Sequence, residues 1–271
     1  MTADTVVVAI AQIDSRADME ANWEQAERLC RRAAKLGAEV VTLPENMLYE
    51  GPDMFCKQDV EGVWKPRLAS LARELGVAIV GGSLREPTPD AADPKSYNTV
   101  LALDSEGVER ARYRKIHLFE VDLPDGTCHK ESDYLCPGSE PVVCDLPPLG
   151  CVGLSICYDL RFPELYRELV KRGAKTLFVP SSFTMETGRD HWLALLKARA
   201  IENQCFVVAA NQVGQKGRKV RKYGRSVIID PWGTELARCP DKPSICLAEL
   251  DFEVLEEARR GLPALEHMRL I

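Results

Sequence analysis

One pattern occurs once in each half of the chain and limits the folds that the chain can adopt. The segments KLGAEVVTLPE (35–45) and KRGAKTLFVPS (171–181) both join the end of a helical pattern to an apolar strand through a Gly-Ala turn, and a proline follows each strand. Two similar βαβ halves within a single domain, residues 1–271, are the economical interpretation. The equivalence places Glu45 and Ser181 at corresponding strand ends, and ligands of open α/β sheets bind at the carboxyl ends of strands.

The same rhythm of strand and helix patterns continues along the chain. Apolar, β-branched runs and amphipathic stretches alternate at 5–12, 19–38, 39–45, 65–75 and 76–84, and again at 151–159, 163–174, 175–183, 190–204 and 205–212. This alternation predicts an α/β fold with largely parallel, buried strands. Pro163 stands where the first turn of a helix tolerates proline. The Pro- and Asp-rich segment 85–96 is typical of a surface loop between strands.

Composition excludes several classes of function. The chain has 271 residues, 45% of them hydrophobic and 28% charged, which is typical of a globular protein. Its net charge of -6 gives no reason to expect nucleic acid or an anionic membrane as a partner. The apolar run at the N-terminus follows an acid, so it indicates a first strand and not a signal peptide. Ten cysteines without such a segment favour reduced thiols in a cytoplasmic protein.

Cys157 raises the main question about function. It stands in GLSICYDLRFPE (153–164), between an apolar strand and a polar turn that leads into a helix. A lone cysteine is most often a small buried hydrophobe. At the start of a helix, however, backbone N–H groups and the helix dipole lower the pKa of a thiol and can hold an oxyanion. The position therefore makes Cys157 a candidate nucleophile.

A nucleophilic cysteine needs a base, and the four histidines show no papain-like arrangement with Asn or Asp. Glu45 ends an apolar strand, where a carboxylate is costly to bury without a partner. Lys115 lies just before another apolar stretch. Taken singly, each of these charged residues is more typical of a salt bridge or a solvated strand end.

Three segments in this order resemble the nitrilase, or carbon-nitrogen hydrolase, superfamily: LPEN (43–46), YRKIHLF (113–119) and GLSICYDLRFPE. The resemblance extends over nearly the whole chain, to YGRSVIIDPWG and LPALEHMR near its end. It implies a four-layer αββα sandwich with two packed mixed sheets, no cofactor, and a homodimer or a higher homo-oligomer. The family's Glu-Lys-Cys triad matches Glu45, Lys115 and Cys157. Its second glutamate matches Glu131, for which an exposed loop acid is the alternative.

The resemblance also implies a reaction. Glu45 takes the thiol proton, Cys157 forms a thioester, and Lys115 with the Tyr158 N–H holds the oxyanion. The motif context is most similar to amidases that act on deaminated glutathione. An omega-amidase acting on 2-oxoglutaramate or 2-oxosuccinamate is the alternative, and a nitrilase or an N-carbamoyl amino acid hydrolase fits less well. A catalytically silent scaffold of the same fold is the non-enzymatic hypothesis.

The candidates for substrate contacts come from the turns around the nucleophile. They are Tyr49, Tyr158, Arg161, Ser181, Phe183 and Thr187. Arg161 can bind a substrate carboxylate through two hydrogen bonds, and an internal pair with Asp159 or Glu164 is the alternative. Phe183 is equally consistent with a core residue.

Three further features have simpler interpretations. Cys128, His129 and Cys136 lack the paired C-x2-C spacing of a structural zinc site, so we expect no metal. The basic run KGRKVRKYGR (216–225) is compatible with a nucleic-acid patch, with a rim that attracts anionic substrates, or with a solvated loop, and the loop is favoured. His191 and Trp192 are expected to stabilise a helix start or a subunit contact.

Overall fold

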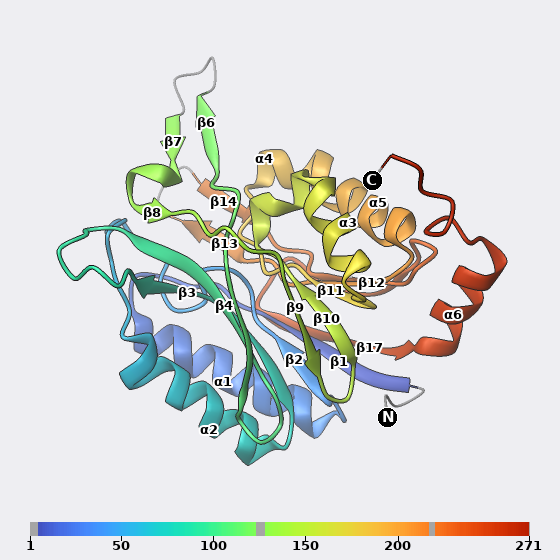
Figure 1. The fold of residues 1–271 in the computed structure, drawn as a ribbon. Coiled ribbons are helices and arrows are strands. Elements are labelled where there is room, and N and C mark those ends of the chain that lie inside the picture. The colour runs from blue at the N-terminus through green and yellow to red at the C-terminus, as the bar shows by residue number, and fades with distance from the viewer. Residues whose placement is uncertain (1–4, 123–127, 217–219, 271) are drawn as a thin grey trace.

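The computed structural model describes residues 5–122, 128–216 and 220–270, and two β-sheets form its centre (Figure 1). The first sheet has the strand order β17-β1-β2-β3-β4-β5, with β8 beside β4. Its strands are β1 (Thr5–Gln12), β2 (Val40–Thr42), β3 (Ala78–Pro87), β4 (Ser96–Leu103), β5 (Glu109–Arg114), β8 (Leu135–Cys136) and β17 (Ser244–Asp251).

The second sheet has the order β16-β15-β12-β11-β10-β9. Its strands are β9 (Val142–Leu146), β10 (Gly150–Leu154), β11 (Thr176–Phe178), β12 (Phe206–Ala209), β15 (Val227–Ile229) and β16 (Glu235–Arg238). Two short hairpins project from the sheets: β6 (Glu120–Asp122) with β7 (Cys128–Lys130), and β13 (Val213–Lys216) with β14 (Val220–Tyr223).

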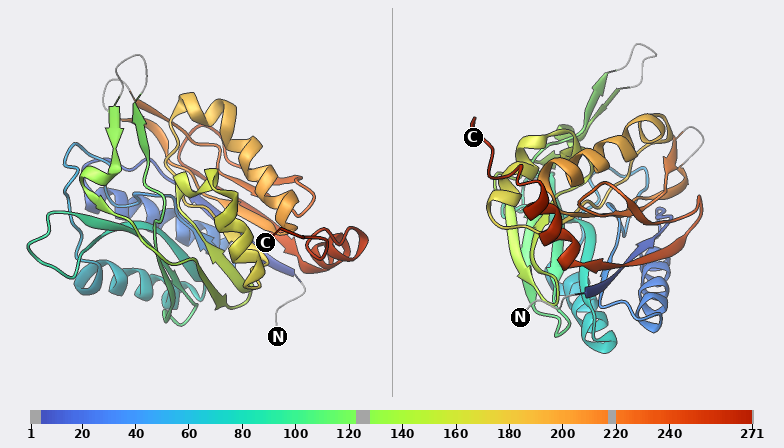
Figure 2. Two further views of the ribbon diagram at one scale, coloured as in Figure 1. Left: turned by 45° about the horizontal axis from the view of Figure 1, so that its top comes forward. Right: turned by 90° about the vertical axis from the view of Figure 1, so that its right-hand side faces the viewer.

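Helices cover the outer face of each sheet (Figure 2). Helices α1 (Met19–Lys35) and α2 (Lys65–Leu75) pack on the first sheet, and α3 (Pro163–Lys171) and α5 (Leu193–Asn203) pack on the second. The short α4 (Met185–Thr187) precedes α5, and α6 (Phe252–Gly261) lies near the C-terminus. The predicted four-layer αββα sandwich is confirmed. No helix in the described ranges is long and apolar enough to cross a membrane.

The sequence patterns explain how the layers pack. Asp18 caps α1 by accepting a hydrogen bond from the Ala21 N–H at 3.1 Å, as N-cap residues do. Side chains along β1 alternate in direction, so Val8 and Ile10 join the core between the sheets while Ala9 joins the core under α1 and α2.

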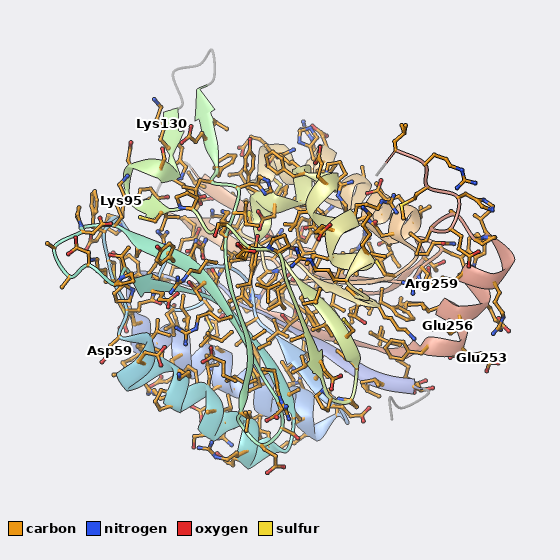
Figure 3. The ribbon with its side chains drawn as sticks, viewed as in Figure 1. Asp59, Lys95, Lys130, Glu253, Glu256 and Arg259 are labelled. Carbon is orange, nitrogen blue, oxygen red and sulfur yellow. The ribbon has the colours of Figure 1, made fainter. Side chains whose placement is uncertain are left out.

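Helix α6 is held against the second half of the chain by charged contacts. Glu256 and Arg259 lie on this helix (Figure 3). Glu256 pairs with Lys175 at 2.6 Å, and Arg259 Nε donates to the backbone oxygen of Gln204 at 3.0 Å. Gln204 Nε2 in turn donates to the Leu262 oxygen at 2.6 Å, just past the helix. The C-terminal segment is therefore attached to the end of α5.

The internal repeat is present in three dimensions, because β2 and β11 are each flanked by parallel strands in their own sheet. The Gly-Ala turns match as well. Gly37 has φ 91° and Gly173 has φ 99°, a backbone region that side chains other than glycine rarely adopt.

The expectation of largely parallel strands was wrong outside the sheet centres. Among the named strands of the described residues, β1-β2-β3, β10-β11-β12 and the short β4-β8 contact are parallel, and the pairs on both flanks of each sheet are antiparallel. The physical reason is that antiparallel strands joined by a hairpin need no crossover helix. An alternation of strand and helix patterns in the sequence therefore does not reveal them.

The predicted surface loop at 85–96 was too long at both ends. Strand β3 continues to Pro87 and β4 begins at Ser96, and both Arg85 and Glu86 are buried. The backbone groups of Arg85 and Glu86 pair with β4, so they do not need hydrogen bonds from solvent.

Candidate active site

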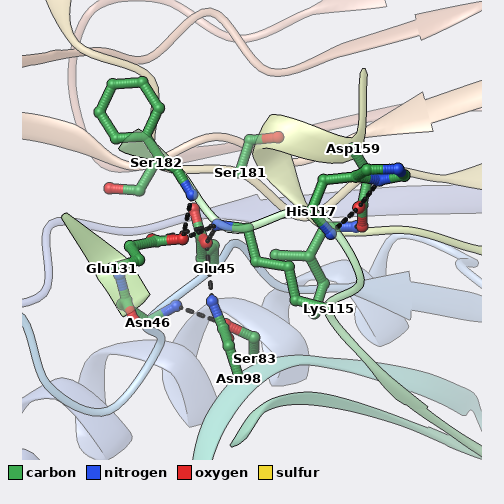
Figure 4. Close-up of polar contacts among 12 residues, drawn as sticks. Glu45, Asn46, Ser83, Asn98, Lys115, His117, Glu131, Asp159, Ser181 and Ser182 are labelled. Atoms are coloured by element: carbon green, nitrogen blue, oxygen red, sulfur yellow. Dashed lines mark hydrogen bonds and ion pairs between the residues drawn. The ribbon is translucent and has the colours of Figure 1, made fainter. Parts of the chain in front are cut away.

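Lys115 lies at the centre of a buried cluster of charged side chains (Figure 4). It directly follows β5, and its side chain is inaccessible to solvent. Its Nζ lies 2.9 Å from Glu45 Oε1 and 2.9 Å from Glu131 Oε2. The structure therefore brings together three residues that are distant in the sequence.

Glu45 lies just beyond β2 and is 2% exposed. Its Oε1 accepts a hydrogen bond from Asn98 Nδ2 at 2.8 Å as well as the one from Lys115. The Lys115 backbone N–H donates to the Asn98 oxygen at 2.8 Å, so Asn98 fixes both neighbours. The sequence analysis missed Asn98. The available signal was a polar amide just before the apolar run of the strand SYNTVLAL.

Glu131 is in a short 3-10 turn after the β6-β7 hairpin and is buried, so its alternative as an exposed loop acid was wrong. Both carboxylate oxygens contact Lys115, at 3.1 and 2.9 Å. Oε2 also accepts the Phe119 backbone N–H at 2.7 Å. These contacts hold the glutamate and the lysine in one orientation.

The contacts within the cluster set the protonation of its members. Burial by itself lowers the pKa of Lys115, but Glu131 and Glu45 outweigh burial and hold that pKa well above its usual value. Burial would raise the pKa of Glu131, yet Lys115 and the Phe119 N–H outweigh it and lower the pKa. The cluster therefore contains a charged lysine between carboxylates.

Cys157 follows β10 and begins a 3-10 turn with φ 47°, an uncommon conformation for a residue with a side chain. Its backbone N–H donates to the Pro180 oxygen at 2.9 Å, which joins the turn to the chain after β11. This contact places Pro180, which directly precedes the candidate Ser181, beside Cys157.

The expected lowering of the thiol pKa was wrong for the free protein. Burial and the neighbouring Glu45 raise the pKa of Cys157 well above its usual value, against the lowering effects of Lys115 and of the Ser182 backbone. The thiol is therefore protonated at neutral pH and needs a base before it can act as a nucleophile.

Arg161 has none of the internal acid partners that were the alternative for it. Among the described residues its guanidinium lies 5.7 Å from the Tyr158 ring and 5.6 Å from the Phe183 ring, and Nη1 lies 3.3 Å from His191 Nδ1. Asp159 instead binds the Ile156 N–H at 2.8 Å. Arg161 is thus a half-buried cation on aromatic rings, close to Cys157 in the sequence.

The other substrate candidates make ordinary structural contacts. Phe183 is 4% exposed and packs on Trp192 at 4.9 Å, while the Ser181 hydroxyl donates to the Val179 oxygen at 3.1 Å. Thr187 approaches the Thr184 hydroxyl at 3.2 Å in the cap of α4.

Tyr49, the remaining substrate candidate, and Trp192, at the start of α5, also form hydrogen bonds within the protein. The Tyr49 hydroxyl accepts the Asp53 N–H at 3.0 Å. Trp192 Nε1 donates to the Arg225 oxygen at 3.0 Å, so Trp192 stabilises the start of α5 as expected. His191 is exposed.

Within the basic run 216–225, Lys216 lies on β13 and residues 220–223 form β14, which pairs with β13, so these residues are not part of a solvated loop. Residues 217–219 lie outside the described residues. Lys222 Nζ pairs with Glu50 Oε1 at 2.7 Å and donates to the Ser182 oxygen at 3.1 Å. The Ser182 hydroxyl donates to Glu50 at 2.8 Å. These contacts join the hairpin to the segment beside Cys157, a link that the sequence analysis missed.

Within the described residues, no group of three or more His, Cys, Asp or Glu side chains is placed to hold a metal ion. The Cys128 side chain, part of the zinc motif considered above, is outside the described side chains.

Comparisons with known proteins show the family of the chain and structures that share its fold. The model of the carbon-nitrogen hydrolase family matches residues 7–260. Deaminated glutathione amidase from Synechocystis sp. (strain PCC 6803 / GT-S) is 40% identical over 265 residues, which cover 96% of this chain and 97% of that protein. The crystal structure of the C. elegans NitFhit protein has a TM-score of 0.92 and 38% identity, covering 99% of this chain and 66% of that chain.

A mutant of the amidase from Nesterenkonia sp. AN1 is also similar, with a TM-score of 0.77 and 28% identity over 95% of each chain. That structure shows covalent addition of the acetamide moiety of fluoroacetamide at the active site cysteine of that protein.

Proposed function

The chain belongs to the carbon-nitrogen hydrolase family, and from that premise we propose that it hydrolyses the amide bond of a small 2-oxo acid amide, with deaminated glutathione as its substrate. It is a hydrolase that acts on carbon-nitrogen bonds other than peptide bonds. The observation that supports the reaction is the Glu45–Lys115–Glu131 cluster beside a protonated Cys157. The similar Synechocystis protein supports the substrate.

In the first half of the proposed reaction, Glu45 accepts the proton of Cys157 as Sγ attacks the amide carbonyl carbon. The carbonyl oxygen becomes an oxyanion, which Lys115 Nζ and the Tyr158 N–H stabilise. The carbon-nitrogen bond then breaks, Glu45 returns the proton to the leaving nitrogen, and a thioester on Cys157 remains.

In the second half, Glu45 removes a proton from water, which attacks the thioester carbonyl. The tetrahedral intermediate collapses, the thiolate leaves and is reprotonated from Glu45, and the carboxylic acid is released. Glu131 keeps Lys115 in position through both halves, because its two oxygens hold Nζ in place.

The test measures the release of 2-oxoglutarate and cysteinylglycine from deaminated glutathione by the wild type, Cys157→Ala and Cys144→Ala. Cys144 is a half-buried cysteine of β9 and serves as the matched control. We expect turnover by the wild type and by Cys144→Ala, and a loss of at least about 1,000-fold in Cys157→Ala. Intact-protein mass spectrometry after acid quenching should find the 2-oxoglutaryl thioester on the wild type.

The outcomes separate the alternatives. A wild type that hydrolyses 2-oxoglutaramate with a kcat/KM well above that for deaminated glutathione is an omega-amidase. A wild type that forms neither thioester nor product from either substrate contradicts the proposal and favours a catalytically silent scaffold.

We also infer that residues 1–271 act as one domain, because the proposed triad draws Glu45 and Lys115 from the first sheet and Cys157 from the second. The nine cysteines whose side chains are described are free thiols, which supports a cytoplasmic location. Fractionation of cells that express a fluorescent fusion checks the location. Gel filtration of the fraction that contains the fusion checks the assembly.

A homodimer is the proposed assembly. Three exposed apolar side chains adjoin the end of α5: Ile201 is 50% exposed, Trp232 57% and Leu262 52%. Ile201 packs against Gly233, next to Trp232, and Gln204 binds the Leu262 oxygen. Exposed apolar patches of this kind mark protein interfaces. Light scattering should show a dimer that Ile201→Asp weakens.

A further inference from the structure

Arg85 is a buried arginine on the same face of the first sheet as the proposed catalytic cluster. It lies in β3 directly opposite Asn98 in the antiparallel β3-β4 pair, and it is 8% exposed. Side chains that oppose each other across such a pair project from the same face with Cβ atoms about 5 Å apart. Because Asn98 binds Glu45 at 2.8 Å, the Arg85 side chain leaves the sheet beside the proposed base.

The Arg85 guanidinium is incompletely paired. Its Nε donates to Asn46 Oδ1 at 3.3 Å, and its carbon lies 5.0 Å from the centre of the Tyr134 ring. The Tyr134 hydroxyl is a further polar neighbour of the guanidinium, and it is neutral because burial raises the pKa of Tyr134. Nη1 is buried and has no hydrogen-bond acceptor, and Arg85 forms no ion pair with any described carboxylate. A buried charged group without a partner is costly, and a guanidinium has five N–H donors to satisfy.

The adjacent acid in the sequence does not supply the missing partner. Glu86 accepts hydrogen bonds from Arg112 Nη1 at 2.7 Å and from Arg114 Nε at 2.9 Å, both on β5. Successive residues of a strand point to opposite faces, so Glu86 projects away from the face that Arg85 occupies. The chain thus pairs two arginines with Glu86 and leaves Arg85 without an acid.

Charge balance alone does not explain Arg85. Glu45 and Glu131 together carry one more charge than Lys115, and the charge of Arg85 helps to lower the pKa of Glu131. The oxygens of Glu131 are nevertheless bound to Lys115 and the Phe119 N–H, and none accepts from Arg85. Charge balance explains why a positive charge lies here, but it does not explain why Nη1 has no hydrogen-bond acceptor.

We propose that Arg85 binds the carboxylate of the 2-oxo acid part of the substrate. This inference rests on the proposed function and names the group that recognises the acyl chain. Arg85 and Asn98 are separated by one cross-strand spacing, about 5 Å. In a five-carbon acid amide the terminal carboxylate lies about 5 Å from the amide carbon. A substrate whose amide carbon lies beside Glu45, which Asn98 binds, therefore has its carboxylate within reach of the Arg85 side chain.

The test compares two amides that differ only at the far end of the acyl chain. Glutaramate has a terminal carboxylate, and pentanamide has a methyl group in its place. In Arg85→Met we expect kcat/KM for glutaramate to fall by roughly 10- to 100-fold, mostly through KM, because a hydrogen bond to a charged group is lost. The value for pentanamide should stay within about two-fold, as charge recognition contributes nothing there.

Two further variants control the experiment. Arg85→Lys keeps the charge and should recover part of the loss with glutaramate, because a lysine cannot form the same paired hydrogen bonds. Arg28→Met, at an exposed position of α1, should leave both substrates unchanged. An equal fall for glutaramate and pentanamide in Arg85→Met would overturn the proposal and assign Arg85 to charge balance.

A binding measurement keeps this inference separate from the proposed function. Calorimetry with 2-oxoglutarate uses the Cys157→Ala protein with and without Arg85→Met, so it needs no turnover. We expect Kd to rise by roughly 10- to 100-fold with Arg85→Met. An unchanged Kd sinks the assignment of Arg85 even if the wild type proves to be an amidase. A wild type that hydrolyses no amide, with the Kd change intact, sinks the proposed reaction alone.

Discussion

Asp159 accepts two hydrogen bonds from His117, one from the backbone N–H at 3.0 Å and one from ring Nδ1 at 2.8 Å (Figure 4). The other carboxylate oxygen of Asp159 accepts from the Tyr113 hydroxyl at 2.7 Å. Tyr113 and His117 stand two residues before and two residues after Lys115. Asp159 stands two residues after Cys157. One buried carboxylate thus connects the turn of the proposed nucleophile to the segment that carries the lysine.

We predict that Asp159→Asn lowers kcat by about 100-fold, because small misplacements of reacting groups have effects of that size. KM should change much less, since Asp159 is fully buried and its oxygens are bound to Tyr113, His117 and the Ile156 N–H. Rapid-quench measurement of thioester formation checks this, because a slower acylation step identifies a positioning role. The exposed Asp145→Asn in β9 is the matched control. Unchanged acylation in a folded Asp159→Asn protein would contradict the prediction.

A second prediction concerns the reactivity of the thiol. Glu45 is one of the two main causes that raise the pKa of Cys157, so Glu45→Gln should shift its alkylation by iodoacetamide to lower pH. Peptide mass spectrometry distinguishes Cys157 from the other cysteines. The same variant should lose amide hydrolysis, because it lacks the base. A pH profile that is identical in the two proteins would show that burial alone controls the thiol.

Stability should depend on pH through Glu131. Its pKa is lower in the folded protein than the usual 4.5, so its contribution is complete above 4.5 and is lost as the pH falls through the folded value. We therefore expect Glu131→Gln to lower Tm at pH 7 and the gap from the wild type to narrow below pH 4.5. Scanning calorimetry from pH 7 to 3.5 measures it. A gap that is constant over this range argues against an ionised Glu131.

The pair of Glu50 and Lys222 should be strongly coupled. Burial by itself lowers the pKa of Lys222, but the neighbouring Glu50 outweighs burial and raises that pKa above its usual value. Both side chains are therefore charged. Lys222→Met alone should cost about 3 kcal/mol in the free energy of unfolding, because it leaves a buried carboxylate with one more distant lysine. The Glu50→Gln, Lys222→Met double variant should be more stable than the sum of the single changes predicts. Urea unfolding followed by circular dichroism gives all four values, and simple additivity would refute the coupling.

Local patterns were sufficient for much of the fold. The alternation of strands and helices predicted the two βαβ centres, and the repeated Gly-Ala turn identified β2 and β11 as equivalents. The antiparallel flanks were missed for two reasons. The β1-β17 pair joins segments near opposite ends of the chain, which no local pattern reports, and hairpin pairs such as β4-β5 and β9-β10 need no crossover helix.

The residues of the site divide in the same way. Glu45, Lys115 and Cys157 lie in motifs that are recognisable as short segments, whereas Asn98 and Arg85 matter through their cross-strand position. The thiol pKa was predicted in the wrong direction for the same reason. A turn before a helix is visible in the sequence, but the burial of Cys157 and the approach of Glu45 from the other sheet are long-range features.

The seam between the two sheets has a consequence for how the protein matures. Glu45 and Lys115 belong to one sheet and Cys157 to the other, so neither half of the internal repeat contains all the proposed reactive groups. A chain with both halves formed but not yet docked is chemically inert. During refolding, the rate at which hydrolysis returns would therefore report the rate at which the two sheets dock.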